Sequence, residues 1–167
     1  MLCGSSSFAV KWQVRERGET TVYGSFAFII SGHEVGDYSE YAHLKGCRNW
    51  MRDFIENPMD RFEPGLFEMD KIQAYRVLAN SILHYDYERD PVEEIYENIS
   101  SRFHVGHIGM SSMDDSFVVL FMENEAGEGR FIWKAWKDEV IKEAYVAPGE
   151  VVRVFTEAVA EMTREFG

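Results

Sequence analysis

Strand-forming residues gather in two separate parts of the chain instead of alternating with helices, which limits the possible folds. Phe8 to Arg15 alternates apolar and polar residues, a pattern typical of a strand with one face in water. A turn at residues 17–19 leads to a second β-rich run over residues 21–30. We therefore predict that the two runs pair as a hairpin, with a short third strand from His33 to Val35.

The second group of strands is predicted in the last third of the chain. Phe117 to Glu123 is apolar on both faces and is expected to be a central strand. A turn at residues 126–129 connects it to a partner strand from Arg130 to Trp136. Val140 to Val146 completes a meander, and Arg102 to Ile108 is a weaker strand candidate.

Helices are predicted where apolar residues recur every three or four positions. One runs from Ser39, as its N-cap, to Glu56, and another from Leu66 to Leu83. Pro91 can open a short helix through Asn98, and a last helix follows Gly149. The buried stripe of this last helix is expected to consist of Val152, Phe155, Val159, Met162 and Phe166.

This order of elements predicts an α+β fold. An antiparallel β-sheet, made of the N-terminal hairpin and the C-terminal meander, would be packed with about three to four α-helices. The 167 residues contain no repeat, low-complexity tract or linker, so one domain over residues 1–167 is expected. Apolar residues make up 46% of the chain, which is enough for one core.

Cysteine content and hydropathy indicate the compartment. Cys3 and Cys47 are the two cysteines, too few for a disulfide framework. No apolar stretch approaches 18 residues, and the start of the chain lacks the pattern of a secretory signal. A cytoplasmic location without membrane attachment is therefore expected.

The formal net charge of −12 argues against unaided binding of nucleic acid, whose phosphates attract basic surfaces. Instead it favours a basic partner, although many acidic proteins are acidic only for solubility. Residues 53–97 carry most of the excess, with twelve acidic and four basic residues. Self-association is left open by the sequence.

The densest acidic segment is the predicted partner-binding site. Six carboxylates fall within residues 86–97, and tyrosines lie between them. Carboxylates can steer a basic partner and tyrosines can anchor it, although such a segment can also be a solvated face. The predicted contact residues are Asp86, Tyr87, Glu88, Asp90, Glu93, Glu94 and Glu97.

Residues with catalytic or metal-binding chemistry are present, but their spacing is weak. His104 and His107 are three residues apart, so on a strand they would point to opposite faces. Cys47 could pair with a histidine, but it falls on the apolar stripe of its helix. We predict no catalytic residue, no metal site and no cofactor. A small metal-dependent hydrolase that uses His104 and His107 is the alternative, and a non-catalytic scaffold subunit is another.

Several segments, in order along the chain, resemble one family. They are Met1-Leu2-Cys3-Gly4, Phe8-Ala9-Val10, Tyr23 to Phe28, Gly32 with Val35 to Tyr38, and Arg130-Phe131-Ile132-Trp133. Together they are similar to an immunity-protein family of bacterial polymorphic toxin and contact-dependent growth inhibition systems, the family numbered forty-two.

The resemblance implies a specific function. Members of such families bind a cognate toxin domain, often a nuclease, and block it inside the cell that makes it. A basic nuclease must grip phosphates, and an acidic inhibitor can present a competing surface of carboxylates. The resemblance does not transfer contact residues, so the acidic segment is predicted from its charge alone.

Overall fold

Five strands from the first third of the chain form one antiparallel sheet, the first sheet. The structure, a computed structural model, describes residues 1–83 and 100–167. The strands are β1 (Leu2–Gly4), β2 (Phe8–Arg17), β3 (Val22–Ile30), β4 (His33–Val35) and β5 (Ala42–His43). Their order is β1-β2-β3-β4, and β5 pairs with the other end of β3. The predicted hairpin and short third strand are confirmed.

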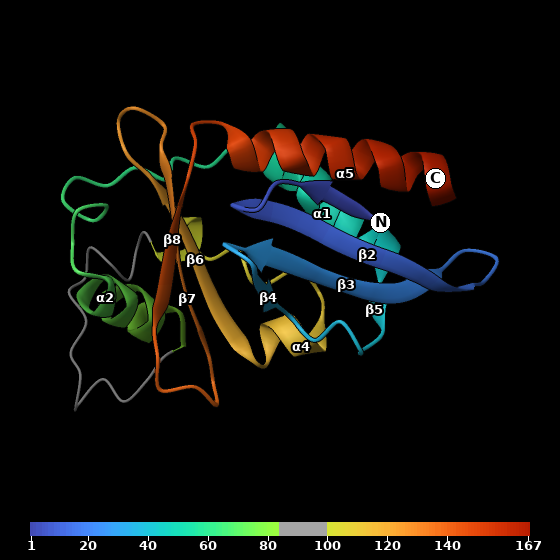
Figure 1. Cartoon of the computed structure of the whole chain (residues 1–167), viewed down its shortest axis with the longest axis horizontal. Helices are drawn as coiled ribbons and strands as arrows, with labels where there is room; N and C mark the ends of the chain where they lie inside the picture. The colour runs from blue at the N-terminus through green and yellow to red at the C-terminus, as the bar shows by residue number, and fades with distance from the viewer. Residues whose placement is uncertain (84–99) are drawn as a thin grey trace.

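The C-terminal meander forms a separate second sheet. It consists of β6 (Phe117–Glu123), β7 (Gly129–Ala135) and β8 (Lys142–Val146), in that order. Its strands run across the direction of β2 and β3 (Figure 1). The predicted α+β class with antiparallel pairing is confirmed, but the hairpin and the meander belong to two sheets and not to one.

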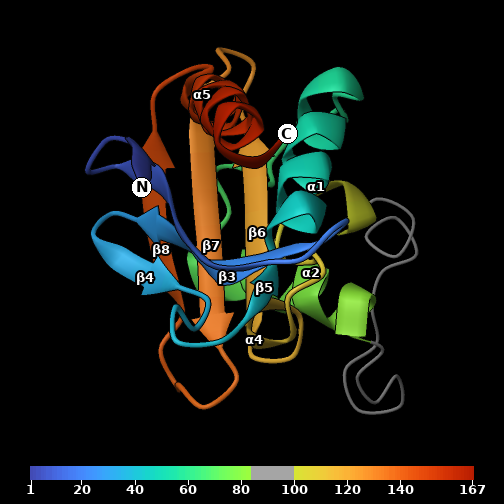
Figure 2. The ribbon, with the colours of Figure 1, turned by 90° about the vertical axis from the view of Figure 1, so that its right-hand side faces the viewer.

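Helices cover the two sheets on different sides. They are α1 (Leu44–Glu56), α2 (Lys71–Leu83), the 3₁₀ turn η1 (Ser100–Arg102), α4 (Ser111–Asp114) and α5 (Glu150–Phe166). α1 and α5 pack on each other and on the first sheet, as Figure 2 shows, and α2 contacts β6 and β7. The short helix predicted from Pro91 to Asn98 lies outside the described residues.

Two apolar cores lie on opposite faces of the second sheet. The main core joins the first sheet, α1, α5 and one face of the meander, and it is rich in aromatic rings such as Phe8, Phe28, Phe121 and Phe155. The second core lies between the other face and α2. Its buried members are Leu66, Phe67, Ala74, Leu78, Ala79, Phe103, Val118, Leu120, Met122 and Ile132.

Both central helices begin later than predicted. Ser39 is not the N-cap of α1, because Ala42 and His43 pair with β3 first, and the helix begins at Leu44. Ser39 instead donates from its N–H and its hydroxyl to the Asp37 carboxylate. α2 begins at Lys71, where the Asp70 carboxylate accepts the N–H groups of the first turn.

Two further predictions need correction. In α5, Phe155, Met162 and Phe166 are buried as predicted, but Val152 is exposed, and Val151 and Val154 are buried instead. β6 is buried on both faces, but it lies at the edge of its sheet. The weak strand candidate 102–108 forms only a bridge from His104 to Leu120, with backbone hydrogen bonds that cover this edge.

Candidate protein-binding surface

The seven residues predicted to bind a partner lie outside the described part of the chain. They are Asp86, Tyr87, Glu88, Asp90, Glu93, Glu94 and Glu97. The surface formed by the described residues carries hollows of its own.

A groove of about 550 Å³, here called the acidic groove, lies where the ends of the two sheets meet. The segment after β4, the start of β6 and the connection between β7 and β8 all contribute to it. Its charged lining consists of five carboxylates and one ammonium group, from Glu34, Asp37, Glu40, Asp115, Asp138 and Lys137. Trp136, 43% exposed, adds a large apolar surface. Negative charge beside an aromatic ring suits a basic protein segment.

Hydrogen bonds hold the acidic groove in shape. The Ser39 hydroxyl and N–H hold the pKa of Asp37 below its usual value, so this carboxylate stays charged at neutral pH. Arg15 donates to the carbonyls of Tyr38 and Ser39 and fixes the same segment. Lys11 lies 3.1 Å from Glu34 and offsets one of the charges.

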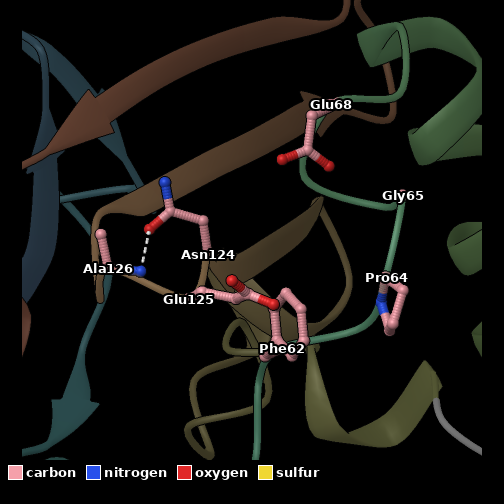
Figure 3. A pocket seen from close by; sticks show the side chains of 7 residues that line it. All are labelled: Phe62, Pro64, Gly65, Glu68, Asn124, Glu125 and Ala126. Atoms are coloured by element: carbon pink, nitrogen blue, oxygen red, sulfur yellow. Dashed lines mark hydrogen bonds between the residues drawn. The ribbon is translucent and has the colours of Figure 1, made fainter.

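A second hollow, of about 440 Å³, lies between residues 62–68 and the turn that joins β6 to β7 (Figure 3). Glu68 and Glu125 are its carboxylates. The Asn124 side chain accepts the N–H groups of Ala126 and Glu128 and thereby fixes the turn. The hollow is thus a well-formed acidic surface, but its lining includes no exposed large aromatic residue comparable with Trp136.

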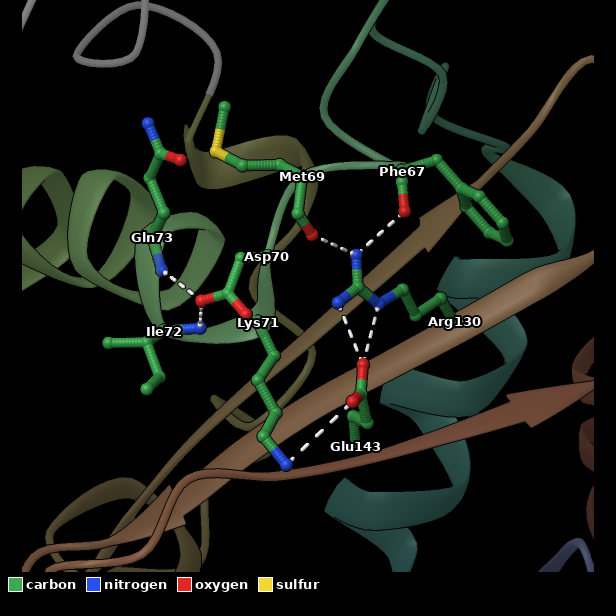
Figure 4. Close-up of polar contacts among 8 residues, drawn as sticks. All are labelled: Phe67, Met69, Asp70, Lys71, Ile72, Gln73, Arg130 and Glu143. Atoms are coloured by element: carbon green, nitrogen blue, oxygen red, sulfur yellow. Dashed lines mark hydrogen bonds and ion pairs between the residues drawn. The ribbon is translucent and has the colours of Figure 1, made fainter.

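Arg130, the first residue of the Arg-Phe-Ile-Trp sequence, is buried inside the fold and is only 3% exposed. It donates to the carbonyls of Phe67 and Met69 at 2.6 and 2.7 Å (Figure 4). Its other nitrogen atoms donate to Oε2 of Glu143, and Lys71 lies 3.7 Å from the other carboxylate oxygen, Oε1. This network ties the segment before α2 to the meander, a role that the sequence alone did not indicate.

His104 and His107 do not assemble a metal site in the described residues. Their ring centroids are 6.4 Å apart, and His107 lies 3.7 Å from the Asp114 carboxylate. In the described part of the chain, no three His, Cys, Asp or Glu residues form a group that could hold a metal ion. The geometry therefore gives the alternative of a metal-dependent hydrolase no support.

His104 should nevertheless make stability depend on pH. Burial lowers its pKa from 6.5 to about 4, so the folded protein binds fewer protons than the unfolded chain between these values. Stability should therefore fall as pH drops from about 6.5 to about 4, with a slope from this group of at most about 1.4 kcal/mol per pH unit. Urea unfolding across this range should show a flatter pH profile for His104→Leu than for the wild type. The control is His107→Gln, which replaces an exposed histidine and should keep most of the pH dependence of stability. Equal slopes in all three proteins would contradict the assignment of this pH dependence to His104.

Cys47 cannot act as a nucleophile in the folded protein. It is 1% exposed, and burial raises the pKa of its thiol to about 12, so the thiolate is not formed at neutral pH. We expect a thiol reagent to modify Cys3, which is partly exposed, while Cys47 reacts only after unfolding. Mass spectrometry of labelled native protein checks this, with Cys3→Ser as the control. Rapid labelling of Cys47 in native Cys3→Ser would contradict the burial.

Two open hollows of the described surface are thus lined mainly by carboxylates, an arrangement that suits the binding of another protein. The chain belongs to the immunity protein 42 family, whose model matches residues 1–161. This membership confirms the predicted function: the chain is an immunity protein that neutralises a toxin.

A solved structure supports the fold. The crystal structure of CdiI from Burkholderia dolosa AUO158 is similar, with a TM-score of 0.75. The match covers 96% of this chain and 99% of that chain at 16% sequence identity. No curated protein matches the sequence. Among the described residues, no helix is long and apolar enough to cross a bilayer.

Proposed function

We propose that the chain binds a basic toxin domain, in a one-to-one complex in the cytoplasm, and blocks it without catalysing a reaction. The acidic groove carries this proposal, because its carboxylates lie beside an exposed tryptophan in one built surface. A toxin that cleaves nucleic acid needs cationic side chains to hold phosphates. Carboxylates of an inhibitor can occupy the same side chains and exclude the substrate.

Charge also supports the proposal through kinetics. An acidic protein attracts a basic one over distances of about a Debye length, which raises the association rate and makes it depend on salt. We propose the acidic segment from Asp86 to Glu97 as a second contact region, because its six carboxylates add to the negative charge that attracts a basic partner. The two regions can be tested separately.

The first test is to identify the partner. Affinity-tagged protein is recovered from its native cells at low and high salt, and co-purifying proteins are identified by mass spectrometry. The candidate toxin domain is then produced alone, and growth of cells that express it is compared with and without this chain. Restored growth together with a stoichiometric purified complex supports the proposal, whereas a substrate that the purified chain converts would contradict it.

Matched variants then locate the contact. Glu40→Gln with Asp138→Asn removes two exposed charges from the acidic groove, and Glu16→Gln with Glu19→Gln removes two from the far end of the β2–β3 hairpin. We expect the groove variant to associate about two- to tenfold more slowly at low salt, and the hairpin variant to change little. Asp86, Glu88, Glu93 and Glu97 changed to Ser test the acidic segment in the same way. Equal rates for all variants would show that neither region steers the toxin.

A further inference from the structure

The connection between β7 and β8, residues 136–141, separates two grooves of opposite charge. On one side lies the acidic groove, lined by Trp136, Lys137 and Asp138 of the connection. On the other side lies a groove of about 450 Å³, here called the basic groove, lined by Glu139, Val140 and Ile141. The connection lies at the lower edge of the views in Figures 1 and 2.

The basic groove contrasts with the charge of the whole chain, which is −12. Among the described residues of its lining, Lys71, Arg76 and Lys134 contribute three cations and Glu139 contributes one carboxylate. Lys71 lies 3.7 Å from Glu143, outside this lining, so part of its charge is offset. Arg76 and Lys134 therefore carry most of the positive charge.

Large apolar side chains are exposed on and beside the same connection. Val140 is 63% exposed, and Trp136 and Ile72 are each 43% exposed. Exposed apolar groups rimmed by charges are typical of protein contact sites, where they anchor the complex and the charges set its orientation. A polyanion such as nucleic acid fits less well, because the adjoining acidic groove would repel it.

We infer that residues 136–141 form a docking ridge that the toxin domain straddles. A cationic segment of the toxin enters the acidic groove, a carboxylate of the toxin faces Arg76 and Lys134, and Trp136 and Val140 pack between them. This inference rests on the proposed function. It adds that recognition depends on charges of both signs, so the toxin can dock in one orientation, because reversing it would oppose like charges on both sides.

Charge reversals distinguish the ridge from general attraction between an acidic and a basic protein. If only net charge mattered, Lys134→Glu would make the chain more acidic and bind a basic toxin more tightly. The ridge requires the opposite result, about tenfold weaker binding, and requires similar weakening from Asp138→Lys. Glu16→Lys, at the far end of the β2–β3 hairpin, is the control for net charge and should change the Kd by less than about threefold.

Trp136→Ala tests the apolar anchor and should weaken binding about tenfold or more through faster dissociation. Tyr23→Ala removes an exposed aromatic ring from β3 and should leave binding unchanged.

Kd values are measured with the purified toxin domain, after circular dichroism confirms that each variant is folded. If wild-type chain binds but Lys134→Glu binds equally or more tightly, the ridge is wrong while the proposed function stands. If the wild-type chain neither binds nor neutralises a basic toxin domain, the proposed function itself fails. If the wild-type chain bound nucleic acid and Lys134→Glu lost this binding while toxin binding stayed unchanged, the docking-ridge inference would also be wrong.

Discussion

Phe155→Ala should lower the free energy of unfolding by about 3–5 kcal/mol, the usual cost of removing a buried phenyl ring. Phe155 is 2% exposed and lies at the centre of the main core. Its ring contacts Phe8, Phe28, Trp50 and Phe54, with the Phe54 centroid 5.0 Å away at an interplanar angle of 89°. These rings come from β2, β3 and α1, so the cavity cannot close by a shift of one element.

Urea unfolding followed by circular dichroism measures this loss. Val152→Ala is the matched control, since Val152 lies on the same helix and is 43% exposed. Its free energy of unfolding should change by less than about 0.5 kcal/mol. A loss below about 1 kcal/mol for Phe155→Ala would mean that the ring does not connect the first sheet, α1 and α5 as described.

Arg130→Met should lower the free energy of unfolding by about 3 kcal/mol or more, because it removes the buried cation of a partly buried ion pair with Glu143 and two hydrogen bonds to backbone carbonyls. The Phe67 and Met69 carbonyls lose the Arg130 donor, and Lys71 is the ion-pair partner that Glu143 keeps among the described residues. Arg130→Lys should be intermediate, since an ammonium group retains the charge but cannot reach both sides as the planar guanidinium does.

The same unfolding measurement gives the result, and Arg153→Met is the control. Arg153 forms an exposed ion pair with Glu157 on α5, which is expected to contribute less than about 1 kcal/mol. Equal small losses for Arg130→Met and Arg153→Met would show that the buried network does not stabilise the fold.

Local patterns explain which parts of the fold were predictable. Alternation in β2, the double-sided apolar run of β6 and the short turns between neighbouring strands all act within a few residues, so they could be read directly. The start of α1 could not, because β5 forms by pairing Ala42 with Gly24, a contact that no local pattern encodes. The division into two sheets likewise depends on packing between distant segments.

The same difference between local patterns and contacts of distant residues applies to the candidate site. A run of carboxylates such as Asp86 to Glu97 is visible in the sequence, and its role stays a prediction. The acidic groove has no such local signal, because Glu40 and Asp138 are far apart in the chain and line the same groove only in the folded protein. Arg130 belongs to a family motif that is visible in the sequence, but its partners Phe67, Met69 and Glu143 come together with it only in the folded chain.

The single buried guanidinium in the meander also bears on how its strands align. Because β6 and most of β7 are buried on both faces, a slip of β7 by one residue would not move a row of hydrophobic side chains into water, which is the usual safeguard against misalignment. Such a slip would instead turn Arg130 from its carbonyl partners towards Phe121 and the other rings of the main core. A charge without partners there would be far costlier than a misfitting methyl group. Arg130 therefore selects one alignment of the strands. In sheets with one solvent-exposed face, the alternation of apolar and polar side chains has this effect.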